Sequence, residues 1–147
     1  MTISDYRAAL VTGASAGIGE AVVADLCARG LTVHAVARRK DKLKALGVAT
    51  GCTTHVMDVQ DTTAMDDLFG SLGVDVLVNN AGVGRAIQSL PDANPADIDQ
   101  TIGTNVTAAL HAVRAVLGPM IKRGHGHIVN IGSVAGLYPL GSGVYGA

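Results

Sequence analysis

The sequence predicts an α/β protein with a doubly wound parallel sheet, and three observations support this fold class. Short apolar runs alternate with longer segments of helical periodicity along the chain. The run at 74–78 is almost entirely apolar, which is typical of a strand covered on both faces. A glycine-rich turn separates the first apolar run from the first helical segment. Because crossover connections share one hand, the alternation favours the strand order 3-2-1-4-5.

Strands and helices are expected in strict alternation within a single domain over residues 1–147. The apolar runs predict strands at 8–11, 33–37, 53–57, 74–78 and 128–131. The helical patterns predict helices at 18–29 (with Ile18, Val22 and Leu26 on one face), at 39–46 (ended by Gly47), at 62–72 and at 95–122. Asn94 suits the N-cap of the last helix and Pro95 its first position. Residues 132–147 are expected to form a glycine-rich loop that ends where a further helix begins.

The composition argues against two classes of partner. The 147 residues are 48% hydrophobic and 16% charged, with a formal net charge of −1. This balance provides no basic excess for nucleic acid. No apolar run is long enough to span a membrane, and the polar start at 1–5 does not resemble a signal peptide. Cys27 and Cys52 have no paired spacing and suit thiols of a reducing compartment, so we expect a cytoplasmic protein.

The five histidines do not form a convincing metal site in the sequence. His34 and His55 fall in predicted strands, where we expect their ring nitrogens to be satisfied. The segment His125-Gly126-His127 resembles a metal pair but lacks a third ligand, and a turn into the last strand is the favoured interpretation. Neither a zinc-protease motif nor a cysteine pair is present, so no metal is expected.

The turn after the first strand has the features of a phosphate cradle. It consists of Thr12-Gly13-Ala14-Ser15-Ala16-Gly17-Ile18-Gly19. Glycines allow a tight turn and a close approach of backbone N–H groups to a pyrophosphate, and the following helix N-terminus adds a favourable dipole. A glycine-rich turn without a ligand is the alternative. The strand–turn–helix setting favours a Rossmann-type dinucleotide site.

The end of the second strand indicates which dinucleotide is bound. Roughly 20 residues after the glycine loop, an NAD site has an acidic residue for the ribose hydroxyls. This sequence has Arg38-Arg39 there instead. An arginine can pair with a 2′-phosphate, which a carboxylate would repel. The two arginines could also be a solvated pair that opens the next helix, and Arg39 fits that alternative better. Arg38 therefore predicts NADP(H) rather than NAD(H).

Six motifs in order make the sequence resemble the short-chain dehydrogenase/reductase family over the whole chain. The glycine loop has the spacing Gly-x-x-x-Gly-x-Gly. The other motifs are Asp58-Val59, Asn79-Asn80-Ala81-Gly82, Thr104-Asn105-Val106, Ile131-Gly132-Ser133 and Tyr145-Gly146-Ala147. Each motif is weak alone, but their order is specific. The resemblance implies hydride transfer between the nicotinamide of NADP(H) and a carbonyl or secondary alcohol.

The resemblance also implies cofactor-binding positions. These are Gly13, Ser15, Gly17, Ile18, Gly19, Arg38, Arg39, Asp58, Val59, Asn80, Ala81, Gly82 and Tyr145. Asp58 would bind the adenine amino group, and the alternative for Asp58 is an N-cap of the next helix. The segment 79–82 would stabilise the central strand and line the ribose side of the cofactor, with a plain turn as the alternative.

Three catalytic residues follow from the same resemblance: Asn105, Ser133 and Tyr145. Tyr145 would exchange a proton with the substrate, and Ser133 would hold the substrate oxygen near the phenol. Asn105 would support a proton relay at a helix kink. The sequence itself places Asn105 on an apolar stripe formed by Ile98, Ile102, Ala109 and Val113. An amide on such a face could equally be satisfied by neighbouring backbone.

The sequence departs from the family pattern at two points. Ser133 and Tyr145 are twelve positions apart, one fewer than the family spacing. The lysine that the family places four residues after the tyrosine would fall at position 149, beyond Ala147. We therefore expect a truncated family member whose substrate is a ketone, a ketoacyl compound or a 3-hydroxy acid. A non-catalytic dinucleotide-binding module and an inactive fragment are the alternatives. The full-length form is expected to be a homodimer or homotetramer.

Overall fold

Five parallel strands form one sheet in the order β3-β2-β1-β4-β5, in a computed structural model that describes residues 2–85, 89–138 and 143–146. The strands are β1 (Ala8–Thr12), β2 (Thr32–Ala37), β3 (Thr53–Val56), β4 (Val76–Asn79) and β5 (His127–Asn130). Every neighbouring pair runs parallel. The predicted fold class and strand order are confirmed.

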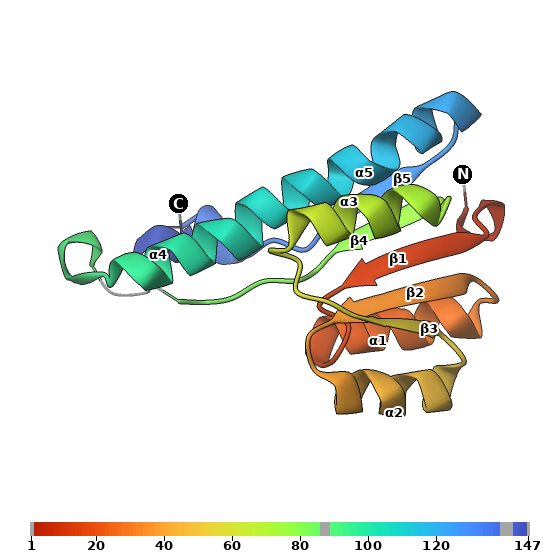
Figure 1. Cartoon of the computed structure of the whole chain (residues 1–147), viewed down its shortest axis with the longest axis horizontal. Coiled ribbons are helices and arrows are strands. Elements are labelled where there is room, and N and C mark those ends of the chain that lie inside the picture. Colours follow the sequence, from red (N-terminus) through yellow and green to blue (C-terminus); the bar gives the residue numbers. More distant parts are fainter. Residues whose placement is uncertain (1, 86–88, 139–142, 147) are drawn as a thin grey trace.

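Helices connect the strands and cover both faces of the sheet (Figure 1). They are α1 (Gly17–Ala28), α2 (Lys40–Thr50), α3 (Thr62–Ser71), α4 (Pro95–Ile102) and α5 (Ala108–Arg123). Short 3-10 turns occur at Ile3–Asp5, Leu90–Asp92, Val134–Gly136 and Gly143–Gly146. Among the described residues, no helix has the length and apolar character needed to cross a membrane.

Two apolar clusters lie on opposite faces of the sheet. On the side of α1 and α2, the cluster includes Ala9 and Val11 of β1. On the side of α3 and α5, it includes Leu10 of β1 together with Phe69 and Met65 of α3. Successive residues of one strand thus enter different cores, because side chains alternate along a strand. This explains why the strand sequences are continuously apolar rather than alternating.

The two cysteines are free thiols, as their spacing predicts. Both pack in the cluster on the α1 and α2 side of the sheet. Burial raises the pKa of the Cys27 thiol, which favours its neutral form.

The second helix is longer than predicted, and Gly47 does not end it. Helix α2 continues to Thr50, and Gly51 follows at φ +75° in the left-handed region. A Cβ at position 47 would lie 3.1 Å from the Thr54 Cγ2 atom of β3. Gly47 therefore permits close packing of the helix on the sheet, whereas Gly51 provides the backbone conformation that terminates a helix.

The long helix predicted at 95–122 is interrupted by a π-helical segment, Gly103–Thr107. Asn94 caps its start as expected, since the Asn94 Oδ1 atom accepts a 2.9 Å bond from the Ala96 N–H. The predicted apolar stripe is wrong: Ile102 is 41% exposed, and the buried residues are Thr101, Thr104, Ala108, Ala112, Val116 and Met120. The buried residues Thr101, Ala108 and Ala112 each lie one position before a residue of the predicted stripe, both before and after the π segment, so the core-facing side of the helix is displaced by one residue throughout.

Candidate functional site

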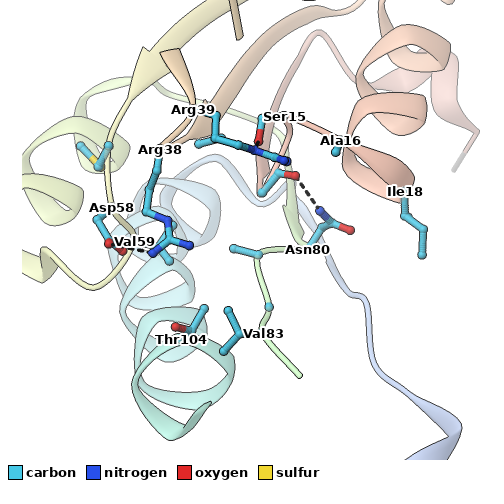
Figure 2. A pocket seen from close by; sticks show the side chains of 15 residues that line it. Ser15, Ala16, Ile18, Arg38, Arg39, Asp58, Val59, Asn80, Val83 and Thr104 are labelled. Atoms are coloured by element: carbon cyan, nitrogen blue, oxygen red, sulfur yellow. Dashed lines mark hydrogen bonds and ion pairs between the residues drawn. The ribbon is translucent and has the colours of Figure 1, made fainter. Parts of the chain in front are cut away.

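The carboxyl ends of the parallel strands meet at one edge of the sheet, and two adjoining cavities lie along this edge. The first has a volume of about 450 Å³ and is lined by the glycine loop and by residues that follow β2, β3 and β4 (Figure 2). The second has a volume of about 610 Å³ and lies toward β5. Both are lined by Ile18, Asn80, Ala81, Gly82 and Val83. Cavities of this size at this edge are typical ligand sites of open α/β sheets.

The three glycines of the loop are required for different reasons. Gly13 has φ +67°, and a Cβ there would lie 2.8 Å from the Ala81 Cα atom. A Cβ on Gly19 would collide with the Asn80 Nδ2 atom and lie 2.7 Å from the Gly13 carbonyl oxygen. Gly17 has φ +61° and no atom within 4 Å of a built Cβ. Gly13 and Gly19 thus permit close packing, whereas Gly17 permits a left-handed turn beside open space.

Helix α1 begins at the first cavity. Ala16 occupies its N-cap and has no side-chain oxygen to accept a bond from the first helical N–H groups. Such N–H groups attract anions. Ile18, which we predicted on the buried face with Val22 and Leu26, is instead 60% exposed between the two cavities. The buried face of α1 is formed by Gly19, Val23 and Leu26, so that part of the prediction is wrong.

Two arginines line the first cavity and reach opposite sides of it. The Arg38 Nη1 atom lies 3.4 Å from the Asp58 Oδ2 atom. The Arg39 Nε–H donates a 2.9 Å bond to the Ser15 Oγ atom of the glycine loop (Figure 2). Arg39 is therefore not simply a solvated residue at the start of α2. The pair gives the cavity positive charge, which suits an anionic group.

Asp58 does not cap the helix that follows it. Asp61 is the N-cap of α3, and its Oδ1 atom accepts a 3.1 Å bond from the Ala64 N–H. The Asp58 Oδ1 atom accepts a 3.0 Å bond from the Gln60 N–H while its other oxygen faces Arg38. The N-cap alternative for Asp58 is wrong, and Asp58 and Val59 both line the first cavity.

The second cavity brings together the three residues predicted to be catalytic. Asn105, Ser133 and Tyr145 all line it. Ser133 follows β5, and its Oγ atom accepts a 3.1 Å bond from the Ala135 N–H. Tyr145 lies in the short 3-10 turn at 143–146, and Ala147 of its motif lies outside the described residues.

The chain matches the sequence profile described as short chain dehydrogenase over residues 7–147. It belongs to this family. The NADP-dependent 3-hydroxy acid dehydrogenase YdfG of Escherichia coli strain K12 is 38% identical over 146 residues, which cover 94% of this chain and 59% of that protein. The probable NADP-dependent dehydrogenase of Haemophilus influenzae is 37% identical, over 94% of this chain and 58% of that protein. The chain thus spans less than two thirds of the length of these relatives.

Solved structures show the same backbone. The closed form of serine dehydrogenase complexed with NADP+ has a TM-score of 0.89 and 37% identity, covering 95% of this chain and 59% of that one. NAD+-bound xylitol dehydrogenase has a TM-score of 0.87 and 30% identity, covering 95% of this chain and 58% of that one. Structures of similar backbone therefore contain either dinucleotide.

Thr12 lines neither cavity, but it supports the loops that do, a role that sequence reasoning missed. Its Oγ1 atom accepts bonds from the N–H groups of Asn80, at 3.1 Å, and Ala81, at 3.0 Å. The Asn80 Nδ2 atom donates to the carbonyl oxygens of Thr12, at 2.9 Å, and Gly13, at 3.3 Å. These bonds fix the loop after β1 against the loop after β4. A threonine directly before a glycine loop was the available signal.

Asn79 supports the end of β4 rather than forming a plain turn. It is buried, and its Nδ2 atom donates to the Asn130 Oδ1 atom at 3.0 Å and to the Ala109 carbonyl oxygen at 3.3 Å. The amide thereby joins β4 to β5 and to α5.

Asn105 lies in the π-helical segment and binds the loop after β4. Its Oδ1 atom accepts a 2.9 Å bond from the Val83 N–H, and its Nδ2 atom donates a 3.0 Å bond to the Val83 carbonyl oxygen. The backbone of Val83 therefore satisfies the amide. The irregular helix expected from the family resemblance is present at this position.

Replacing Asn105 by alanine is expected to lower the free energy of unfolding by about 2 kcal/mol, because it removes two hydrogen bonds of about 1 kcal/mol each. Urea denaturation measures this loss. The Asn105→Asp variant retains an acceptor for the Val83 N–H but places a carboxylate oxygen against the Val83 carbonyl oxygen, so it should not recover the lost stability. Equal stability of wild type and Asn105→Ala would contradict a structural role for this amide.

Proposed function

We propose that this chain is the cofactor-binding part of an NADP(H)-dependent oxidoreductase that acts on a carbonyl or secondary alcohol. The observation that supports this most directly is the pair of joined cavities. One contains Arg38 and Arg39 beside the glycine loop, and the other contains Ser133 and Tyr145. The relatives named NADP-dependent dehydrogenases support the same proposal.

The residues of the first cavity fit this cofactor. The open space beside Gly17 and the start of α1 would accommodate a pyrophosphate, with Ser15 and Ile18 at its border. Arg38, assisted by Arg39, would hold the 2′-phosphate. Asp58 and Val59 would contact the adenine. The segment 80–82, shared by the two cavities, would line the ribose on the nicotinamide side.

The chain's own residues would orient the substrate and move its proton. When bound, the cofactor supplies or receives the hydride. The Ser133 hydroxyl would donate a hydrogen bond to the substrate oxygen and fix its position. The Tyr145 phenol would donate a proton to that oxygen during reduction and accept it during oxidation. Asn105 would hold the Val83 loop that borders both cavities.

The finer parts of the proposal concern substrate, assembly and location. A ketone, a ketoacyl compound or a 3-hydroxy acid is proposed, and the name of the YdfG relatives supports the last of these. Exposed apolar residues on the long helix support a homodimer or homotetramer of the full-length form. These include Leu110, 64% exposed, and Ile121, 69% exposed. A cytoplasmic location fits the free thiols.

Titration of NADPH against the chain, followed by fluorescence, tests the cofactor assignment. NADPH is expected to bind at least tenfold more tightly than NADH. Equal binding of the two would contradict the assignment of Arg38 and Arg39.

The proton-transfer assignment is tested in a full-length protein that contains this chain. With a panel of ketones, Tyr145→Phe is expected to reduce kcat by at least about a hundredfold, the usual contribution of a general acid. NADPH affinity should change little. The exposed Tyr138 provides the matched control, Tyr138→Phe. Undiminished activity of Tyr145→Phe would overturn the proton-donor role, and NADPH binding without turnover would favour a non-catalytic module.

A further inference from the structure

Two histidines lie side by side on neighbouring strands, away from both cavities. His34 is on β2 and His55 is on β3, and the His34 Nδ1 atom lies 3.0 Å from the His55 Nε2 atom. Their rings stack with centroids 5.3 Å apart and an interplanar angle of 28°. Both residues are half-buried. As the sequence predicts, both histidines lie in strands, and one nitrogen of each ring has a partner.

The sheet holds this pair in a fixed geometry. In the parallel register, His34 pairs with Thr53 and Val36 pairs with His55. His34 and Val36 are two residues apart, so both histidines lie on the same face of the sheet. Two adjacent hydrogen-bonded strands restrict the backbone at both positions. The fold therefore already holds the two imidazoles close together, so binding of an ion would cost little further conformational entropy.

We propose that His34 and His55 form a chelating site for one divalent transition-metal ion of the Cu²⁺ or Ni²⁺ type. The ligands would be the two ring nitrogens that now contact each other. Metal–imidazole bonds are about 2.0–2.1 Å long, so two such ligands at a right angle are about 2.9 Å apart. The observed separation of 3.0 Å matches this spacing. Because the two nitrogens now face each other, both rings would have to rotate so that their lone pairs converge on the ion.

The protonation state of the pair suits a metal. Burial lowers the pKa of His34, and burial together with the charge of His34 lowers the pKa of His55. Metal ligands must be neutral imidazoles, and these shifts favour that form. One of the two contacting nitrogens now bears the shared hydrogen. On binding, that ring would move its proton to its other nitrogen, so no net proton would be released.

The ligand set determines which metal is preferred. Among the described residues, no group of three His, Cys, Asp or Glu side chains could enclose an ion. Water would complete the coordination, which differs from the four protein ligands of structural zinc. Two imidazoles with water suit tetragonal Cu²⁺ and Ni²⁺, and the usual affinity order places Cu²⁺ above Ni²⁺. Oxygen-preferring Mg²⁺ and Ca²⁺ are expected not to bind here.

A second pair of histidines provides the matched control. His125 and His127 lie beside Tyr6, with ring centroids 4.8 and 6.0 Å from the tyrosine ring. They flank one glycine on a single chain segment rather than joining two strands. Replacing both by glutamine removes as many imidazoles as replacing His34 and His55, but leaves the proposed site intact.

Calorimetric titration of the tag-free chain with NiCl₂ and CuCl₂ tests the proposal. One ion per chain is expected, together with a rise in the thermal midpoint, because the ion would bind only the folded state. His34→Gln and His55→Gln should each weaken Ni²⁺ binding at least tenfold and abolish that rise. The His125→Gln/His127→Gln variant should retain both effects. Circular dichroism in chelator verifies that each variant is folded.

Two results would overturn the proposal. One is unchanged Ni²⁺ affinity in both single variants, and the other is loss of binding in the His125→Gln/His127→Gln variant. If a single variant does not fold, electron paramagnetic resonance of the Cu²⁺-loaded control variant decides the question. Couplings from two nitrogens support the site, and oxygen-only coordination contradicts it. None of these measurements depends on dinucleotide binding or turnover.

Discussion

The Gly13→Ala variant is expected to lose about 3 kcal/mol of unfolding free energy and its dinucleotide binding. The added Cβ would lie 2.8 Å from the Ala81 Cα atom and 2.9 Å from the Ala81 nitrogen. Because both are backbone atoms, neither can rotate away, and overpacking of this kind costs about 1–3 kcal/mol. The φ of +67° adds about 1 kcal/mol for a residue with a side chain.

Gly30→Ala is the matched control. Gly30 has φ +86°, yet a Cβ there would have no atom within 4 Å. The Gly30→Ala variant should therefore lose only the unfolding free energy of about 1 kcal/mol that comes from backbone strain, because its Cβ collides with nothing. Chemical denaturation of both variants measures the difference, and NADPH titration follows on whichever remains folded. Equal losses in the two variants would show that contact between the glycine loop and the loop after β4 contributes little.

The Arg38→Ala variant is expected to bind NADPH about tenfold to a hundredfold more weakly, with little change for NADH. A hydrogen bond to a charged group contributes about 1.5–3 kcal/mol, and 1.4 kcal/mol is a factor of about ten. The ion pair with Asp58 would also be lost, but exposed pairs of this kind contribute little to stability. The preference for NADPH over NADH should therefore change more than the free energy of unfolding.

Two further arginine variants distinguish the roles. Arg29→Ala removes an exposed arginine paired with Asp25 at the end of α1 and should leave both affinities unchanged. Arg39→Ala also breaks the bond to Ser15, so it should affect both dinucleotides if the glycine loop depends on that bond. Fluorescence titration measures the affinities of these two variants for NADPH and for NADH. A preference for NADPH that persists in Arg38→Ala would assign the 2′-phosphate to Arg39.

Much of the fold could be predicted because buried parallel strands and their crossover helices leave strong periodic patterns. The glycine loop was equally visible, since its spacing and its place after a strand are both local features. The predictions were wrong where one local sequence pattern is compatible with two structural roles. Gly47 and Gly51 are the same residue type, and only the backbone φ shows which one ends α2. The N-cap role given as the alternative for Asp58 is wrong for the same reason, because Asp61 three positions later accepts the capping bond.

The remaining differences arise from contacts between distant segments. The bond between Arg39 and Ser15 joins residues 24 positions apart, and no spacing rule predicts it. The predicted apolar stripe with Ile102 lies one position from the face that packs on the sheet, because small residues such as Ala108 and Ala112 occupy that face. Asn105 was selected from the family motif, and it lines the second cavity. Its partner, the Val83 backbone, belongs to another loop and was not predictable from the sequence.

The bond between Thr12 and Asn80 has a consequence for the order in which the protein folds. It joins residues 68 positions apart, whereas β1, β2 and β3 follow one another closely in the chain. Closing the longer loop costs more chain entropy, and the contacts that depend on this closure therefore form more slowly. The unit β1–α1–β2–α2–β3 is therefore expected to assemble before β4 inserts beside β1. The first cavity would then be complete only late in folding, so a nucleotide would stabilise the finished sheet without guiding its early assembly.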